Sequence, residues 1–139
     1  MTQNSSYPDL PCQALIYRLG RSKTFVDAIA RKFTPAAFMR RPPTNEQARG
    51  DEDGLSVNPV HTCSLEDAKS GFNGTVLAKV HGVATLHVGR VRDIGLNVIQ
   101  DDEQHGLITR LPYATDDLVE ANRLASALAD QSRLVWPDA

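Results

Sequence analysis

Two histidines and two arginines interrupt an apolar, β-branched stretch between Val83 and Arg110, and they are His87, Arg90, Arg92 and His105. Burying a cation or an imidazole costs free energy unless a partner satisfies it. A stretch that mixes these groups with Val, Leu and Ile therefore either exposes one face of a sheet or builds a site for an anion. The chemistry suggested by these residues is the binding of phosphate or carboxylate.

The segment Gly89–Asp93 would bring two guanidinium groups together if it were extended. Residues two apart in a strand share a face, so Arg90 and Arg92 could bind one phosphate in a bidentate manner. The alternative is a solvent-facing edge, on which Asp93 pairs with one of them. His87 lies just upstream and is either a catalytic group or a structural histidine with satisfied hydrogen bonds.

A second candidate anion site lies at the end of the first apolar run, Ala14–Leu19. Arg18 leaves this run toward a glycine-containing turn and could hold a phosphate, while Tyr17 could stack on a ring. The plainer interpretation is a half-buried Tyr beside an Arg whose stem covers apolar surface. Ser56 and His105 are further candidates, because each lies at a loop-to-strand junction, where functional groups tend to collect.

Other kinds of site find little support in the sequence. Cys12, Cys63 and His61 do not have the spacing of zinc ligands, and we expect no metal. The acidic run Asp101–Glu103 is typical of a solvated loop, because a calcium loop needs alternating oxygen ligands around a central glycine. The chain has no Gly-rich nucleotide-binding motif, which excludes a Rossmann or P-loop interpretation.

The 139 residues, 41% of them hydrophobic, suffice for one domain with one core. The net charge of -2 conceals an asymmetry: residues 1–50 carry eight Lys or Arg and three Asp or Glu, and residues 51–139 carry seven and fourteen. The basic half could attract nucleic acid, but pairing with the acidic half is the favoured interpretation. Two cysteines and the lack of a long apolar segment predict a cytoplasmic protein with no membrane contact.

The patterning predicts a single α+β domain over residues 13–136, with a flexible tail at 1–12 and a mobile loop at 40–54. We expect a small twisted sheet of short strands, one or two short helices and a long C-terminal amphipathic helix. The expected strands are short apolar runs, at 14–19, 55–57, 75–80, 83–88, 94–99 and 107–111. The expected helices are one at 25–32, which the spacing leaves open, one capped by Ser64, and one from Thr115 to Trp136.

Five short motifs carry a resemblance to known proteins. They are Leu15-Ile16-Tyr17-Arg18, Ala37-Phe38, Asp53-Gly54-Leu55-Ser56-Val57, Leu86-His87-Val88-Gly89-Arg90-Val91-Arg92-Asp93 and His105-Gly106-Leu107-Ile108. Over residues 13–136 the chain resembles a family of short, uncharacterised bacterial proteins. The order of its parts is also similar to that of small ADP-ribosyltransferase-like domains, which include bacterial toxins and the NAD-dependent RNA 2'-phosphotransferases.

Those domains place an aromatic-flanked Arg or His on the first strand, a Ser or Thr on a middle strand and a catalytic group on a late strand. The resemblance implies that Arg18 holds a pyrophosphate or ribose and that Ser56 takes the middle-strand position. It also implies that Tyr17 or Phe38 packs against nicotinamide.

At the late-strand position the transferases usually carry a Glu, which stabilises the oxocarbenium-like sugar. This chain has His105 there, with Glu103 two residues earlier. The RNA phosphotransferases rely instead on several Arg and His residues, a character that His87, Arg90 and Arg92 share.

The leading hypothesis is an anion- or nucleotide-binding domain, an ADP-ribosyltransferase-like enzyme that uses NAD or a phosphorylated nucleic-acid end. It requires Arg18, Arg90, Arg92 and His105 to converge on phosphates in one cleft. The alternative is a non-catalytic protein-interaction module, such as a partner or immunity component of a toxin-antitoxin or regulatory system, binding through a sheet edge or the loop at 40–54. RNA binding by the basic half is a third hypothesis.

Overall fold

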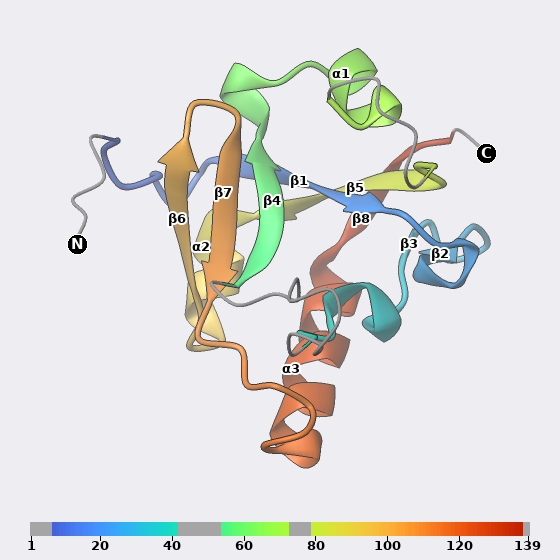
Figure 1. The fold of residues 1–139 in the computed structure, drawn as a ribbon, viewed down its shortest axis with the longest axis vertical. Helices are drawn as coiled ribbons and strands as arrows, with labels where there is room; N and C mark the ends of the chain where they lie inside the picture. Colours follow the sequence, from blue (N-terminus) through green and yellow to red (C-terminus); the bar gives the residue numbers. More distant parts are fainter. Residues whose placement is uncertain (1–6, 42–53, 73–78, 138–139) are drawn as a thin grey trace, which may run out of the picture.

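An antiparallel six-stranded sheet organises the computed structural model, which describes residues 7–41, 54–72 and 79–137. The strand order is β6-β7-β4-β1-β5-β8, so the first strand of the chain lies between β4 and β5 inside the sheet. The bounds of these strands are β1 Leu15–Gly20, β4 Leu55–Pro59, β5 Gly82–His87, β6 Asn97–Asp102, β7 His105–Thr109 and β8 Arg133–Trp136. Figure 1 shows α-helices around this sheet, and the predicted α+β class is confirmed.

Helices and short turns connect the strands. The α-helices are α1 Leu65–Ser70, α2 Val88–Asp93 and α3 Leu118–Gln131. The 3-10 turns are η1 Lys23–Phe25, η2 Pro35–Phe38 and η3 Val60–Thr62, and the small hairpin is formed by β2 Val26–Asp27 and β3 Lys32–Phe33. In the part of the chain that the structure describes, no helix combines the length and the apolar character needed to cross a membrane.

Alternation along β1 divides the buried side chains between two cores. Ile16 faces the main core, which contains the buried face of α3 and the 3-10 turn η2. Tyr17 faces a smaller core together with Ala68 of α1 and Val83 of β5. Because successive strand residues point to opposite faces, Arg18 returns to the side of Ile16 and η2. The sheet is therefore covered on both faces at this point.

The long C-terminal helix is shorter than predicted. Asp117 rather than Thr115 is its N-cap and accepts a hydrogen bond from the backbone N–H of Glu120 at 3.0 Å. The helix ends at Gln131, and the following Arg133–Trp136 form β8 against β5. Val135 thus belongs to a strand, where a β-branched side chain packs well, and not to the helical stripe.

The helix predicted at 25–32 is wrong. η1 ends at Phe25, and β2 and β3 then form a hairpin whose turn is closed by the Asp27 side chain, which accepts from Ala30 N–H at 3.0 Å. Arg31 has a φ of 61°, which interrupts any helix there. The hydrogen bond of the Asp27 side chain therefore determines the local structure here, and the helical spacing of apolar residues does not.

Other boundaries also differ from the sequence prediction. Residues 75–78 of the strand predicted at 75–80 lie outside the described residues, and positions 79 and 80 are not in a strand. The strand predicted at 94–99 begins at Asn97, because Ile94 caps α2. Leu10, within the predicted flexible tail, is 3% exposed and packs in the main core. Of the predicted loop, 42–53 lie outside the described part.

β1 pairs with β4 over a short length only, which leaves a gap between the two strands beyond the paired residues. Only Ile16 with Pro59 and Tyr17 with Asn58 are in register, whereas β1 pairs with β5 along its whole length. Beyond these two pairs the strands separate, and Figure 1 shows β4 and β1 running in clearly different directions. This separation creates room between two neighbouring strands of one sheet.

Candidate functional site

A cleft of about 1210 Å³ lies where β1 and β4 separate. Its described walls are the end of β1 with η1, the η2 segment, the outer side of β4, the C-terminal end of α1, and the turn between β6 and β7. Four of the predicted site residues line it, and they are Arg18, Ser56, Glu103 and His105. The first strand, a middle strand and a late strand each contribute to this group.

Arg18 bridges two walls of the cleft through backbone carbonyl groups. Its Nε and Nη2 donate to the carbonyl O of Ala37 at 3.0 and 2.8 Å, and its Nη1 donates to the carbonyl O of Ser56 at 2.8 Å. The planar guanidinium suits this arrangement, because its donors point in fixed directions. These bonds hold η2 and β4 at a set distance and bring a positive charge to the cleft.

The β6–β7 turn is anchored from three directions. The amide of Asn58 donates to the carbonyl O of Gln104 at 2.6 Å, and the thiol of Cys63 donates to the same oxygen at 3.6 Å. From the other side, the buried side chain of Gln100 donates to the carbonyl O of Glu103 at 3.1 Å. Side chains on this turn, including Glu103, are therefore carried by a fixed backbone.

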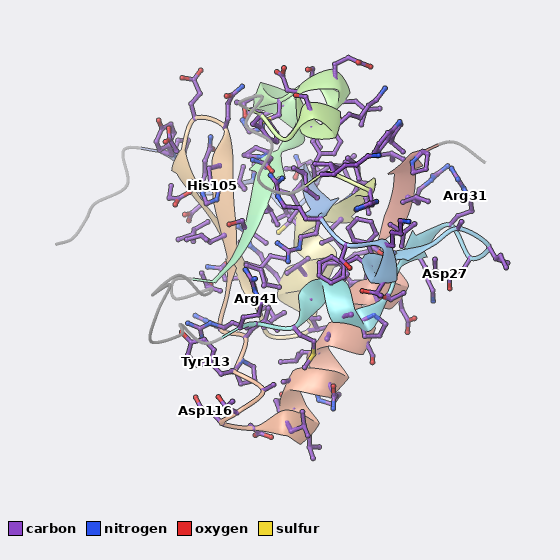
Figure 2. The ribbon with its side chains drawn as sticks, turned by 45° about the vertical axis from the view of Figure 1, so that its right-hand side comes forward. Asp27, Arg31, Arg41, His105, Tyr113 and Asp116 are labelled. Carbon is purple, nitrogen blue, oxygen red and sulfur yellow. The ribbon has the colours of Figure 1, made fainter. Side chains whose placement is uncertain are left out.

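His105 begins β7 and forms a hydrogen bond with Asp101 across the turn. Its Nδ1 lies 2.7 Å from Asp101 Oδ1, and the two side chains are 37% and 41% exposed. Figure 2 shows His105 on this hairpin, well separated from Asp27 and Arg31 at the far edge of the molecule. The cleft thus holds an imidazole whose ring orientation is set by a carboxylate.

Charge is divided between the walls of the cleft. Three arginines, Arg18, Arg21 and Arg41, line the side formed by β1, η1 and the segment that follows η2. Asp102 and Glu103 line the side formed by the hairpin turn. A ligand with an anionic part and a cationic part would match this distribution, because each part would meet the opposite charge.

Two aromatic residues line the cleft, and neither was predicted to do so. They are Phe25 and Phe72. Phe72 has a φ of 78°, directly after Gly71 in the same left-handed conformation, a region that costs an aromatic residue about 1–3 kcal/mol. The capping turn of α1 supports it, since Phe72 N–H donates to Asp67 O at 2.9 Å.

The two aromatic residues expected to contact a ligand do not line the cleft. Tyr17 is 8% exposed and lies in the smaller core, because it points to the opposite face from Arg18. Phe38 is fully buried in the main core, with its ring 6.2 Å from that of Phe33. Both residues therefore complete hydrophobic cores and do not face the cleft.

The environment of the smaller core perturbs two titratable groups near the anchored turn. Burial raises the pKa of the Cys63 thiol, and the charge of Asp67 acts in the same direction, against the hydrogen bond from Thr62. Burial also raises the pKa of the Tyr17 phenol, with Cys63 as a second cause. Both groups are therefore held in their neutral, protonated forms.

The remaining predicted residues lie elsewhere. His87, Arg90 and Arg92 line a separate, shallower depression of about 440 Å³ together with Cys12. Gly89–Asp93 is not extended but part of α2, so Arg90 and Arg92 do not share a face as a strand would impose.

Arg92 is engaged within the fold. It donates to Asn97 Oδ1 at 3.0 Å, to Val98 O at 3.3 Å and to Cys12 Sγ at 3.4 Å. The expected convergence of Arg90 and Arg92 with Arg18 and His105 on one cleft is therefore not found.

Sequence reasoning also missed Arg21, Asn58 and Asp101. Arg21 directly follows Gly20, the last residue of β1 and the glycine that singled out Arg18. Asn58 lies next to a proline and was interpreted as the end of a strand, and Asp101 was placed in a solvated acidic loop. No local pattern indicates the roles of Asn58 and Asp101, because Asn58 depends on a partner 46 positions away and Asp101 on an irregularity in strand pairing.

The described side chains do not include a group of three or more His, Cys, Asp or Glu residues arranged to hold a metal ion. Comparison with known proteins finds no matching family model, no matching curated protein and no matching solved structure. The site must therefore be interpreted from its own geometry.

Proposed function

We propose that the cleft between β1 and β4 binds NAD and that the domain is an ADP-ribosyltransferase-like enzyme. One observation supports this proposal above the others. Arg18 on the first strand, Ser56 on a middle strand, His105 at the start of a late strand and Glu103 in the turn just before it line a single cleft. These are the three positions at which the resembling transferases carry their functional groups.

The chemistry of NAD fits the cleft. Its pyrophosphate is anionic and would be favoured near the guanidinium groups of Arg18 and Arg21. Its nicotinamide ring is cationic and flat, and would be favoured against an aromatic ring such as Phe72 and near the carboxylate of Glu103. A phosphorylated nucleic-acid end has the anionic group but not the cationic ring, so it would be matched only by the arginine side of the cleft.

The proposed reaction breaks the glycosidic bond between ribose C1' and the nicotinamide nitrogen. Nicotinamide leaves as a neutral molecule with the bonding electron pair, and positive charge develops on the sugar. The carboxylate of Glu103 would stabilise this charge, a contribution that is largest in the transition state. An acceptor hydroxyl or amine then bonds to C1' and releases its proton to a base.

Calorimetric titration with NAD tests the proposal, with one arginine variant in each depression. Arg21→Ala removes a cation from the cleft, and Arg90→Ala removes one from the other depression. We expect Arg21→Ala to weaken NAD binding about 10-fold, equivalent to about 1.4 kcal/mol, and Arg90→Ala to leave it unchanged. Glu103→Gln should retain binding but slow the release of nicotinamide by roughly 10²-fold.

Titration with 5'-phosphorylated RNA distinguishes the alternatives. Binding of RNA without NAD would replace the dinucleotide by a nucleic-acid end as the substrate. If neither ligand binds, and Arg90→Ala or Arg92→Ala instead weakens the capture of a protein, the domain is the non-catalytic interaction module. Either result would overturn the NAD proposal.

A further inference from the structure

A β-bulge in the hairpin beside the cleft brings Asp101 to His105. Gln100 pairs with Gly106 and Asp102 pairs with His105, which leaves Asp101 as an extra residue in β6. In a bulge of this kind two residues oppose one on the neighbouring strand, so the alternation of faces is broken. Asp101 and Asp102 both oppose His105, and the Asp101 carboxylate reaches the imidazole at 2.7 Å.

We propose that Asp101 is a positioning residue that keeps His105 ready to accept a proton during the reaction, an inference that rests on the proposed function. An ionised carboxylate only accepts hydrogen bonds. The ring atom facing it, Nδ1, must therefore carry the proton in the neutral imidazole, and Nε2 carries the lone pair. An imidazole without this partner favours the opposite tautomer, in which Nε2 is protonated and cannot act as a base.

On this hairpin, Glu103 would stabilise the charge on the sugar and His105, oriented by Asp101, would accept the proton. Glu103 and His105 both line the cleft, whereas Asp101 contacts the cleft only through His105. With water as acceptor, the oxygen bonds to ribose C1' as nicotinamide departs, and the water proton moves to Nε2 of His105. The Asp101 carboxylate then faces the imidazolium and stabilises its charge. ADP-ribose, nicotinamide and one proton are the products.

The anchored β6–β7 turn restricts the positions of Asp101 and His105. Asn58 and Cys63 both hold the carbonyl of Gln104, which immediately precedes His105. Gln100, which immediately precedes the bulged Asp101, holds the carbonyl of Glu103. Both members of the pair thus neighbour an anchored peptide, unlike two long side chains that meet on an open surface.

The test combines a spectroscopic and a kinetic measurement on the whole chain. Nitrogen-15 NMR of labelled histidine, recorded on the neutral ring, reports which nitrogen is protonated, and a His105→Gln variant identifies the signal among the four histidines. Nicotinamide release from NAD in water reports the reaction. We expect the Nδ1–H tautomer in the unmodified protein and mainly the Nε2–H tautomer in Asp101→Ala.

Asp101→Ala should also slow nicotinamide release by roughly 10²-fold while leaving the calorimetric affinity for NAD within about twofold. Asp130→Ala is the matched control, because it removes a carboxylate that contacts Lys32 at a similar distance, 2.9 Å, and neither of these residues lines the cleft. We expect it to change neither measurement. Thermal denaturation of both variants verifies that they fold.

Two results would overturn the inference while the proposed function stands. One is an unmodified protein in which His105 is already protonated at Nε2, and the other is an Asp101→Ala variant that releases nicotinamide at the original rate. An unmodified protein that neither binds nor cleaves NAD would instead overturn the proposed function, and the role assigned to Asp101 would fall with it.

Discussion

The guanidinium of Arg18 joins β1 to β4 where the two strands stop pairing, by donating from Nη1 to the carbonyl O of Ser56 at 2.8 Å. The bond uses the backbone of Ser56 and not its hydroxyl, which lies on the exposed side of β4. Arg18 and Ser56 therefore do not only lie close together in the cleft, because a hydrogen bond also links them directly. Changes at Arg18 should affect both the stability of the fold and the binding of a ligand.

Arg18→Lys should lower the free energy of unfolding by about 1–3 kcal/mol, because a single ammonium cannot reproduce the fork that bonds to Ala37 and Ser56. Urea denaturation measures this change. Arg90→Lys is the control, since Arg90 is exposed outside the cleft. Identical denaturation midpoints for the two variants would show that the Arg18 bridge does not stabilise the sheet.

Gly54→Ala should destabilise the protein by about 2–4 kcal/mol. Gly54 has a φ of +135°, and a Cβ there would lie 2.4 Å from the carbonyl O of Ile108 on β7. Gly95→Ala isolates the backbone contribution, because Gly95 has a φ of +92° but has open space around its Cβ position. We expect a loss of about 1 kcal/mol for that variant in chemical denaturation, and equal losses would contradict a steric role for Gly54.

Phe72→Leu should weaken NAD binding about 10-fold and change stability by less than about 1 kcal/mol, because it removes the ring but keeps an apolar side chain beside the smaller core. Phe38→Leu should do the reverse. It opens space in the main core and costs about 1–3 kcal/mol without touching the cleft. Calorimetry and thermal denaturation measure the two effects, and a stronger binding defect in Phe38→Leu would refute this assignment of the aromatic residues.

Stability should decrease as the pH rises above about 9, the ordinary pKa of a thiol. The pKa of Cys63 is raised by burial, so the unfolded chain loses this proton at a lower pH than the folded protein does. Between the two values the folded state binds more protons, and the free energy of unfolding falls with increasing pH. Tyr17 acts in the same direction at higher pH, since its pKa is raised above 10.0.

Cys63→Ala should reduce the loss of unfolding free energy that begins above about pH 9. Tyr17→Phe should reduce the further loss above about pH 10.0. Urea denaturation at several alkaline pH values measures both. A Cys12→Ala variant serves as the thiol control, because Cys12 is exposed. If Cys63→Ala left the slope unchanged, burial of the thiol would not explain the loss of stability.

Features specified by neighbouring residues were predicted well. The strand β1, the strand core of β4, and the start of α1 at its Ser64 cap follow from short-range alternation and from one side-chain hydrogen bond, 3.1 Å from Asp67 N–H to Ser64 Oγ. Four of the residues singled out by such signals, Arg18, Ser56, Glu103 and His105, line one cleft. These signals come from neighbouring residues, so they do not depend on contacts with distant parts of the chain.

The sequence by itself determined the α+β class, the segments that form β1, β4, β5, β6 and β7, and the cationic side chains that are candidates for binding an anion. Only the tertiary structure decided which of those groups meet. The order β6-β7-β4-β1-β5-β8 brings Arg18 to the hairpin of His105, while the helical geometry of α2 leaves Arg90 and Arg92 in a second depression. The role of Asp101 depends on a bulge in strand pairing. Strand order and register are set by contacts between distant residues and the burial that they achieve, and no local pattern encodes them.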